Sequence, residues 1–408
     1  MYLHRHIEKL IFQRGKTCQT VLVTGARQVG KSTLLENSAA KDIPQFSLDD
    51  ITLLASIKRD MQGFLDDNKP PLFIDEIQYA PELFRGIKVI IDKRKDEDGL
   101  YYMTGSQKFE LMQGVSESLS GRIAVLNLLG LSSREINGEE FTDPFIPTQE
   151  FIKTRETNKM LSSQELWKRI HRGFFPRLVL RSSLDWEGFY ADYMKTYIER
   201  DVQKLSQVGD TVSFVNFMTI LAARTGQLLN YASVARDAGV SEPVIKKWIS
   251  ILEASNIIYL LRPFSLNVTT RVVKTPKLYF LDTGLASYLC RWLTPETLQN
   301  GALNGQIFET YVVGEILKSY YNAGKEPPLY FYRNEKAEEV DLLFYLNGTL
   351  HPVEIKKTAS PNAGDVSVFR LLEKAFPSIK IGTGALICTY DKVLPLTDNV
   401  KIVPVNLI

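Results

Sequence analysis

The stretch GARQVGKST, near the start of the chain, combines glycines, a lysine and hydroxyl groups at a spacing that suits phosphate chemistry. Gly25, four intervening residues and then Gly30, Lys31 and Ser32 have the pattern of a phosphate-binding loop. An apolar run at 20–23 precedes the loop and a helical pattern follows it, which is the context that such a loop requires. The sequence therefore predicts an anion site between a strand and a helix.

The backbone and side chains of this loop have separate roles in the predicted site. Glycine lets backbone amides crowd around an anion, and the following helix adds the partial positive charge of its N-terminus. Lys31 can reach the β- and γ-phosphates of a nucleotide, and the Ser32 hydroxyl can ligate Mg²⁺. Arg27 fits either a nucleotide contact or a solvent-facing position. The predicted nucleotide-binding residues are Gly25, Ala26, Arg27, Gln28, Val29, Gly30, Lys31, Ser32, Thr33 and Asp75.

Two acids close a second apolar strand, in LFIDE. Asp75 is predicted to hold Mg²⁺ through water, and Glu76 to polarise the water that attacks the γ-phosphate. Burying two adjacent carboxylates without a cation is costly, so the pair itself indicates a metal. A further strand, LYYMTGS, ends in Thr104 and Ser106, which are placed to sense the γ-phosphate. Glu76 and Ser106 are therefore predicted catalytic residues.

A third candidate site lies near the C-terminus, in EEVDLLFYLNGTLHPVEIKK. Asn347-Gly348 favours a two-residue hairpin loop of type I′. Counting outward from that loop places Asp341 opposite Glu354, with Lys356 on the same face as Glu354. Two carboxylates directly across a ladder destabilise a sheet, whereas a hard cation between them would hold them together.

An acid followed by Glu-x-Lys on the adjoining strand is what a metal-dependent phosphodiesterase needs, with acids that hold Mg²⁺ or Mn²⁺ and a lysine that positions water. The pattern resembles the restriction-endonuclease family, in which a helix before the hairpin adds an acid. Glu309 matches that position better than Glu315. The resemblance implies metal ligation by Asp341, Glu354 and Glu309, with Lys356 as the catalytic residue.

The same residues allow two other interpretations. One is an ordinary hairpin with a solvated charged end, and the other is a nuclease-like fold that has lost its activity. Glu315, Glu339 and Lys357 are expected on solvent-exposed faces, and the hairpin register places Glu339 opposite Lys356.

The elements that must position the first site are five predicted strands separated by helical segments, which is typical of a doubly wound parallel sheet. The strands are 20–23, QFSLDD, 72–74, LYYMTGS and RIAVLNL. A polar connector with several prolines follows at 138–163. After it, a helix at 231–238 ends at Gly239, and Ser241 is predicted to cap a second helix at 242–254.

Helix, tight turn, helix and then the β-rich run IIYLL is the pattern of a winged helix. Its second helix carries two lysines, and the following stretch carries further basic residues and no acid. Such a strip suits contact with the phosphates of DNA, while a lid or a docking surface is the alternative. The basic residues are Lys246, Lys247, Arg262, Arg271, Lys274 and Lys277, of which Lys246, Lys247, Arg271 and Lys274 are the predicted DNA contacts.

The composition of the chain limits which of these interpretations are possible. A chain of 408 residues with 44% hydrophobic and 24% charged residues is too long for one typical core. The net charge of +2 requires no nucleic-acid or membrane partner, so a basic surface must be local. The three cysteines are scattered, which fits a reducing cytoplasm. No apolar run approaches the ~20 residues of a membrane span, and the first residues lack the apolar core of a signal peptide.

GARQVGKST, FSLDD, FIDEIQ, MTGS and SLSGR occur in the order of the AAA+ ATPase motifs, and the chain resembles the archaeal-type branch of that family over essentially its whole length. Proteins of that branch carry a C-terminal restriction-endonuclease-like domain. The resemblance implies ATP and Mg²⁺ as cofactors, and a homo-oligomer, with a hexamer as one candidate. Arg122, in SLSGR, matches the catalytic arginine that a neighbouring subunit supplies, and a surface arginine with a local ion pair is the alternative.

The resulting fold class is α/β, with an AAA+ doubly wound parallel sheet, a central helical and winged-helix region and a C-terminal α/β restriction-endonuclease-like domain. The predicted domains are residues 1–140, an AAA+ ATPase domain; 141–225, a helical lid or connector; 226–285, a winged-helix-like domain; and 286–408, a restriction-endonuclease-like domain.

The leading hypothesis is a cytoplasmic enzyme that binds and hydrolyses ATP and acts on branched or single-stranded DNA, with a Mg²⁺-dependent nuclease site at its C-terminus. The alternative is a nucleotide-controlled switch that binds a protein partner and carries a degenerate nuclease-like domain. A membrane-bound ATPase is disfavoured by the absence of a spanning segment.

Overall fold

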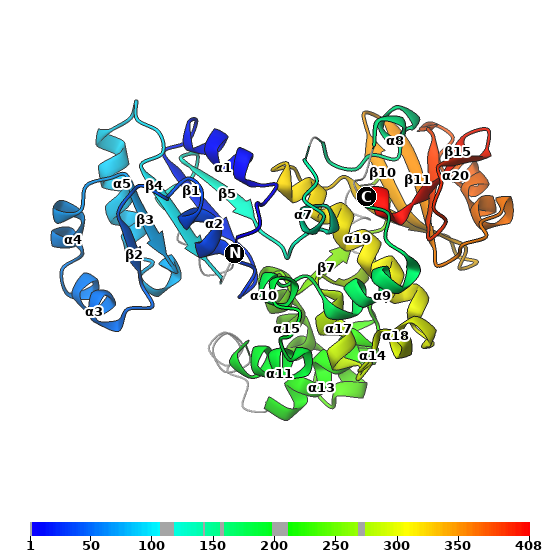
Figure 1. Cartoon of the computed structure of the whole chain (residues 1–408), viewed down its shortest axis with the longest axis horizontal. Helices are drawn as coiled ribbons and strands as arrows, with labels where there is room; N and C mark the ends of the chain where they lie inside the picture. The colour runs from blue at the N-terminus through cyan, green and yellow to red at the C-terminus, as the bar shows by residue number, and fades with distance from the viewer. Residues whose placement is uncertain (1, 107–117, 142, 156–158, 198–210, 268–273) are drawn as a thin grey trace.

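The computed structural model describes residues 2–106, 118–141, 143–155, 159–197, 211–267 and 274–408. In Figure 1 an N-terminal sheet and a C-terminal sheet lie on opposite sides of the molecule, with a helical part beneath and between them. The long helix α19 (Asn304–Asn322) runs through the region where these parts meet.

The N-terminal sheet is parallel, with strand order β2-β3-β4-β1-β5. All five predicted strands form, and Thr20 aligns with Tyr101 of β4 and with Ile123 of β5. The strands are β1 (Thr20–Thr24), β2 (Gln45–Ser47), β3 (Leu72–Asp75), β4 (Tyr101–Gly105) and β5 (Ile123–Asn127). The helices around them are α1 (Glu8–Gly15), α2 (Lys31–Glu36), α3 (Ile51–Arg59), α4 (Met61–Asp67), the short η1 (Ile77–Tyr79) and α5 (Leu83–Lys93).

Alternate residues of these strands enter two separate cores. Val21 and Val23 of β1 pack into the core that continues toward the rest of the chain. Leu22, between them, packs into a second core with Phe84 and Ile87 of α5. Because both faces of the sheet are covered, β1 is buried along its whole length, as is typical of parallel sheets between helices.

The middle part is helical, with a small antiparallel sheet of strand order β6-β8-β7. The predicted helices at 231–238 and 242–254 form with those bounds, and Gly239 ends the first of them at φ 70°. Ser241 precedes the second helix but makes no side-chain cap. Its helices are α7 (Ser133–Ile136), α8 (Gln149–Thr154), α9 (Ser163–Arg172), α10 (Pro176–Leu180), α11 (Trp186–Tyr197), α13 (Thr211–Ala222), α14 (Tyr231–Ala238), α15 (Glu242–Ala254), α17 (Thr283–Leu289) and α18 (Pro295–Asn300). Its strands are β6 (Gln227–Leu228), β7 (Ile258–Leu261) and β8 (Lys277–Phe280).

Helix α13 packs on α15 although the predicted boundary at residue 226 separates them. The rings of Phe214 and Phe217 each lie 5.1 Å, between ring centroids, from Trp248 of α15. From Thr211 onward, the described residues of α13, α14, α15 and the three strands therefore pack as one unit.

The C-terminal part is a mixed sheet of strand order β14-β15-β13-β11-β10-β9, with β12 beside β11. Helix α19 covers one face and is buried along most of its length, while η3 and α20 cover the other. The strands are β9 (Leu329–Arg333), β10 (Glu339–Leu346), β11 (Thr349–Lys356), β12 (Lys380–Ile381), β13 (Gly384–Cys388), β14 (Leu394–Thr397) and β15 (Val400–Pro404). The helical elements are η3 (Ala363–Phe369), α20 (Arg370–Ala375) and η4 (Val405–Leu407).

The β10–β11 hairpin has the predicted loop and register at its tip. Asn347 and Gly348 have φ values of 48° and 78°, as a type I′ turn requires. The ladder runs from Leu346–Thr349 to Leu342–Val353. Beyond it, the register of β10 with β9 shifts between Val340 and Leu343, which marks a β-bulge or a similar irregularity.

The acids lie just beyond the regular part of this ladder. It ends at Leu342–Val353, one position before the predicted Asp341–Glu354 pair. At that position the Asp341 carboxylate accepts a hydrogen bond from the backbone N of Ile355 at 2.9 Å. On the other edge of β10, Glu339 aligns with Arg333 of β9. The extra residue of a bulge locally turns a strand and its side chains.

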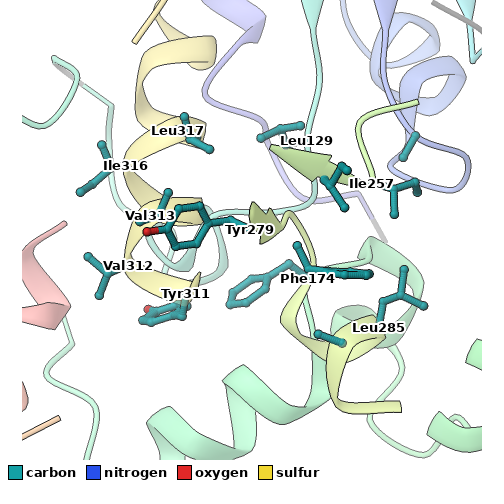
Figure 2. Packing of buried hydrophobic residues seen from close by; sticks show 14 of the residues in the cluster. Leu129, Phe174, Ile257, Tyr279, Leu285, Tyr311, Val312, Val313, Ile316 and Leu317 are labelled. Carbon is teal, nitrogen blue, oxygen red and sulfur yellow. The ribbon is translucent and has the colours of Figure 1, made fainter. Parts of the chain in front are cut away.

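A continuous apolar core joins the three parts of the chain. Figure 2 shows Leu129, which follows β5, together with Phe174, Ile257, Leu285 of α17 and Val313 of α19. Because side chains from each part share this core, the parts cannot separate without exposing apolar surface to water. Among the described helices, none combines the length and the apolarity needed to cross a membrane.

Candidate functional site

The phosphate-binding loop lies between the end of β1 and the start of α2, as its residues predict. A Cβ atom on Gly25 would lie 2.2 Å from the carbonyl oxygen of Leu128, so no other residue fits there. Gly30 has φ 90° and directly precedes Lys31, the first residue of α2. The loop therefore presents backbone amides at the N-terminus of a helix, where an anion is favoured.

The cationic and metal-ligating groups of the loop lie where nucleotide phosphates would bind. Lys31 is 5% exposed, and its Nζ donates to the carbonyl oxygens of Gly25 at 3.1 Å and Ala26 at 3.0 Å. Ser32 Oγ donates to Asp75 Oδ1 at 2.6 Å. The two predicted Mg²⁺ ligands, one on α2 and one at the end of β3, are therefore brought together by the sheet.

Glu76 follows β3 with φ 55°, in the left-handed region that side-chain-bearing residues seldom adopt. Backbone strain of this kind is typical of functional sites. The backbone N of Glu76 donates to Thr104 Oγ1 at 3.1 Å, and its carboxylate accepts from Ser106 Oγ at 3.3 Å and from Gln78 Nε2. Strands β3 and β4 thus bring Glu76, Thr104 and Ser106 together, and Gln78 joins them although sequence analysis did not single it out.

A cavity of about 780 Å³ lies over the loop, a size that suits a nucleotide. Residues 28–33 and Glu76 form one side of it. The other side is formed by Arg177, Arg181 and neighbouring residues of α10, and by Tyr2 and Leu3. Sequence analysis missed these residues, because nothing in their spacing connects GFFPRL to a loop about 150 residues earlier.

Two contacts hold the middle part of the chain against the loop. A Cβ atom built on Gly30 would lie 3.7 Å from Pro176 Cγ, so α10 begins directly over the phosphate-binding loop. Arg5 is 6% exposed and donates to the carbonyl oxygens of Val29 at 3.1 Å and Leu129 at 2.9 Å. Its Nε also pairs with the buried Glu135 at 3.0 Å.

Arg122 lies at the other end of the sheet from the cavity. It precedes Ile123, which aligns with Thr20 at the start of β1, whereas the loop follows the end of β1. Its guanidinium pairs with Asp92 at 2.7 Å, and both side chains are more than a third exposed. Arg122 therefore cannot serve the cavity of its own chain, and its role toward a neighbouring subunit remains a prediction.

The predicted nuclease residues do come together in the C-terminal part. Asp341 is 8% exposed and Glu354 is 4% exposed, and Lys356 Nζ lies 2.6 Å from Glu354 Oε1. Glu309, on α19, accepts a hydrogen bond from Tyr279 at 2.5 Å. Each predicted metal ligand thus already has a partner from the chain.

Lys277, at the start of β8, lies at the centre of this group. Its Nζ is 2.9 Å from Glu309, 2.5 Å from Glu339 and 3.8 Å from Asp341, measured to the nearest carboxylate oxygen. Its side chain is 3% exposed, so Lys277 is not part of an exposed basic strip as the sequence indicated. We refer to Lys277, Glu309, Glu339, Asp341, Glu354 and Lys356 as the C-terminal charge cluster.

Burial and neighbouring charges both shift the pKa values of the cluster. Burial raises the pKa of Glu309 to about 7, against the lowering effect of Lys277. Burial and the neighbouring Asp341 raise the pKa of Glu354 to about 8. Burial acts to lower the pKa of Lys277, but the surrounding acids and Tyr279 raise it well above its ordinary value. The lysine is therefore held as an ammonium ion.

Three residues that were expected on solvent-exposed faces are buried or partly buried in the structure. Glu315 is 3% exposed, pairs with Lys318 at 2.7 Å and accepts from Ser133 N at 2.8 Å. Glu339 is largely buried, and Lys357 is half-buried with its Nζ 5.2 Å from the centroid of the Trp167 ring. In the described part of the chain, no three His, Cys, Asp or Glu side chains are grouped so that they could hold a metal ion.

The predicted DNA contacts that the structure describes are exposed to solvent. Lys246 and Lys247 are exposed on α15, and Lys246 pairs with Glu242 at 2.7 Å. Lys274 is exposed just before β8. Arg271 lies outside the described residues.

Family comparisons agree with the geometry of the nucleotide site. Residues 17–137 match a family model described as an AAA domain. This part of the chain is an AAA domain. Residues 163–296 match a model described as a domain of unknown function (DUF8612), and residues 304–408 match another (DUF4143). The AAA domain therefore accounts for the cavity, while the matched families leave the charge cluster unassigned.

The similarity to known proteins extends beyond the AAA domain. Uncharacterized proteins of Mycobacterium bovis and Mycobacterium tuberculosis are each 27% identical over 393 residues, which are 95% of this chain and 80% of theirs. A Walker-type ATPase of Pyrococcus abyssi is 16% identical, with a TM-score of 0.45 over 71% of this chain and 96% of that chain. The RuvB Holliday junction branch migration motor of Thermotoga maritima is 16% identical, with a TM-score of 0.28 over 62% of this chain and 85% of that chain.

Replacing Arg177 and Arg181 together by alanine is expected to lower kcat/KM for ATP hydrolysis about 10²-fold, because two of the positive charges that line the cavity would be removed. The double variant and each single variant would be compared in a steady-state phosphate-release assay. Arg59→Ala, at an exposed position on α3, is the control and should leave the rate unchanged. An unchanged rate in the double variant would show that α10 does not contact the nucleotide.

Proposed function

We propose that the chain hydrolyses ATP in the cavity of its AAA domain and uses the nucleotide state to move its middle and C-terminal parts against DNA. The observation that carries this proposal is that α10, from the middle part, forms one side of the cavity with Arg177 and Arg181. A nucleotide held by residues of both parts must favour one arrangement of them over another.

The residues of the cavity fit ATP with Mg²⁺. Ser32 and Asp75, whose side chains already meet, would hold Mg²⁺, which would neutralise charge on the phosphates. Lys31 would move from two carbonyl oxygens of its own loop to the β- and γ-phosphates. Glu76 would accept a hydrogen bond from the attacking water, and Ser106 would hold the Glu76 side chain in place.

A short path of hydrogen bonds leads from the cavity to the rest of the chain. The backbone N of Phe174, just before α10, donates to Asp282 Oδ2 at 2.7 Å. Asp282 also accepts from Tyr190 at 2.6 Å and from Leu285 N at 2.7 Å. Because Asp282 follows β8, a displacement of α10 on nucleotide binding would act on the β6-β8-β7 sheet and on the charge cluster beyond it.

Helix α13, β6, α14, α15, β7 and β8 have the order and sheet pairing of a winged helix, and we propose that this unit contacts DNA. Lys246 and Lys247 are exposed on α15, which corresponds to the helix that contacts DNA in such folds. The exposed ion pair of Lys246 with Glu242 is weak in water and would exchange for a phosphate. We further propose that the C-terminal sheet is restriction-endonuclease-like, since its hairpin presents the expected acids and lysine.

The experiment that tests this proposal measures ATP hydrolysis with and without branched or single-stranded DNA. Stimulation is expected, and DNA binding should weaken at least tenfold when three exposed lysines are changed together to glutamate. The slope of log affinity against log salt concentration should fall by about one for each phosphate that is no longer neutralised. The three lysines are Lys246, Lys247 and Lys274.

The matched control changes three exposed lysines of the AAA domain to glutamate in the same way: Lys41, Lys58 and Lys69. This control alters the net charge equally, so it separates a local contact from general electrostatic attraction. If DNA neither binds nor stimulates hydrolysis, the DNA role is excluded. If both triple variants bind DNA equally, Lys246, Lys247 and Lys274 are excluded as its contact.

A second candidate function is a nucleotide-controlled switch that binds a protein partner, with a degenerate nuclease-like domain. The position of Lys277 among the acids favours it, because an internal ammonium ion occupies the place where catalysis would need a metal. Cleavage of DNA in the presence of Mg²⁺ or Mn²⁺ that is abolished in Asp341→Ala would exclude this candidate.

A further inference from the structure

The C-terminal charge cluster contains a cation supplied by a distant part of the chain. Lys277 begins β8, whereas Glu309 lies on α19 and Glu339 and Asp341 lie on β10. Three carboxylate oxygens from these residues lie within 3.8 Å of Lys277 Nζ. Carboxylate oxygens that converge on one point are the ligands that Mg²⁺, Mn²⁺ and Ca²⁺ prefer.

We propose that the ammonium group of Lys277 takes the position of a divalent cation in this cluster, so that the cluster binds a metal ion only when Lys277 is removed. The inference depends on the geometry of the charge cluster alone. It is therefore independent of whether the AAA domain hydrolyses ATP.

Charge and burial explain why the lysine is required. Buried carboxylates that lack a counter-ion cost several kcal/mol each, and the cluster has few alternatives to Lys277. Lys356 pairs with Glu354 at 2.6 Å, and Arg333 pairs with Glu339 Oε2 at 3.0 Å, which is not the oxygen that Lys277 contacts. Without Lys277, Glu309 and Asp341 would have no cationic partner among the ion pairs of the described residues.

Two of the acids lie two residues apart on β10. Residues i and i+2 of a strand share one face of the sheet, so Glu339 and Asp341 both reach the same ammonium group. The register of β10 with β9 shifts between Val340 and Leu343, directly beside these acids. Bulges next to binding sites are a recurring feature of sheets.

The cluster also keeps an unused ligand atom. Glu354 Oε2 is buried and has no hydrogen-bond partner among the described residues, although Glu354 is only 4% exposed. As they stand, the described side chains are not grouped to hold a metal. A divalent ion binds oxygen at about 2.0–2.6 Å. After removal of the amine, Glu309 and Glu339 would therefore need to approach its position by less than about 1 Å, and Asp341 by roughly 1–2 Å.

The test measures Mn²⁺ binding to the full-length chain without nucleotide, by the decrease of the electron paramagnetic resonance signal of free Mn²⁺. Lys277→Met keeps the unbranched stem of the side chain, removes its charge and vacates the position of Nζ. It should bind one Mn²⁺ at least tenfold more tightly than the unmodified chain, and adding Asp341→Asn to it should abolish the gain. Lys277→Gln should gain the same site if the methionine variant does not fold.

Lys318 provides a matched control. It is also 3% exposed and pairs with a buried acid, Glu315, at 2.7 Å, but it has a single carboxylate partner. Lys318→Met should therefore lose stability without gaining a Mn²⁺ site, which separates a loosened interior from a vacated cation position.

Two results would overturn the proposal. The first is that the unmodified chain binds Mn²⁺ in a manner that Asp341→Asn abolishes, because the lysine and the metal would then coexist. This measurement needs no Lys277 variant, so it decides the question even if every such variant unfolds. The second is that a folded Lys277→Met or Lys277→Gln chain binds no more Mn²⁺ than the unmodified chain. Neither result depends on ATP hydrolysis.

Discussion

Lys31→Ala is expected to weaken the binding of ATP with Mg²⁺ by about 10²–10³-fold, since it truncates a buried charge that pairs with phosphate. Lys31 is 5% exposed at the first position of α2, and its amine lies among loop carbonyls on the wall of the cavity. Among the described residues Lys31 is the only lysine that lines this cavity, and its other cations, Arg5, Arg177 and Arg181, come from outside the loop. A titration with a fluorescent ATP analogue would measure the weakening.

The variant must be shown to fold, because the carbonyl oxygens of Gly25 and Ala26 lose a donor in it. Leaving such groups unsatisfied costs about 1–3 kcal/mol, which thermal unfolding in the absence of nucleotide would detect. Lys58→Ala, at an exposed position on α3, is the control for the removal of a lysine. Unchanged ATP affinity in a folded Lys31→Ala chain would mean that the cavity is not the nucleotide site.

Glu76→Gln is expected to lower kcat for ATP hydrolysis about 10²–10⁴-fold while ATP binding changes little, because glutamine cannot act as a base toward water. The substitution keeps the shape of the side chain and its place between Gln78 and Ser106. Single-turnover hydrolysis and the binding titration would separate the two effects. Glu82→Gln, just before α5 and outside the cavity lining, is the matched control.

If Glu76→Gln hydrolyses ATP at the rate of the unmodified chain, another group must activate the water. If it loses ATP binding as well, the carboxylate serves the fold or the metal rather than the chemical step. A folded variant that retains ATP would also hold the chain in one nucleotide state, in which DNA binding can be measured without turnover.

Mixtures of variants test whether the chain assembles into an oligomer with shared sites. Arg122 lies away from the cavity of its own chain, so we propose that it acts on a neighbouring subunit of a homo-oligomer, such as a hexamer. Mixing Lys31→Ala chains with Arg122→Ala chains should then restore part of the ATP hydrolysis, since some interfaces would contain an intact loop and an intact arginine. No recovery in a mixture that forms oligomers would argue for a local role of Arg122.

Much of the nucleotide site could be predicted because its signals are local. A loop of fixed spacing between a strand and a helix leaves its backbone few conformations, and two acids that follow an apolar strand of a parallel sheet lie at the carboxyl edge of that sheet. Parallel pairing then brings Ser32 next to Asp75 and Glu76 next to Ser106, as the order of strands implies. The hairpin tip was equally predictable, since Asn347-Gly348 sets its turn.

The residues that complete the cavity and the charge cluster could not be predicted, because they come from distant parts of the sequence. Arg177 and Arg181 reach the cavity only through the shared core that holds α10 over the loop. Lys277 has the sequence context of a basic strip, yet the pairing of β8 and the packing of α19 bury it among acids. The irregularity in β10 has no clear signal in the sequence.

The opposing acids near the C-terminus led the sequence analysis to require a cation, and the structure contains one. By itself the sequence determined that these acids lie on neighbouring strands of one hairpin, because local turn chemistry sets that register. Only the tertiary structure decided that the cation is the amine of Lys277, because a residue 64 positions before Asp341 can meet it only through the packing of separate elements.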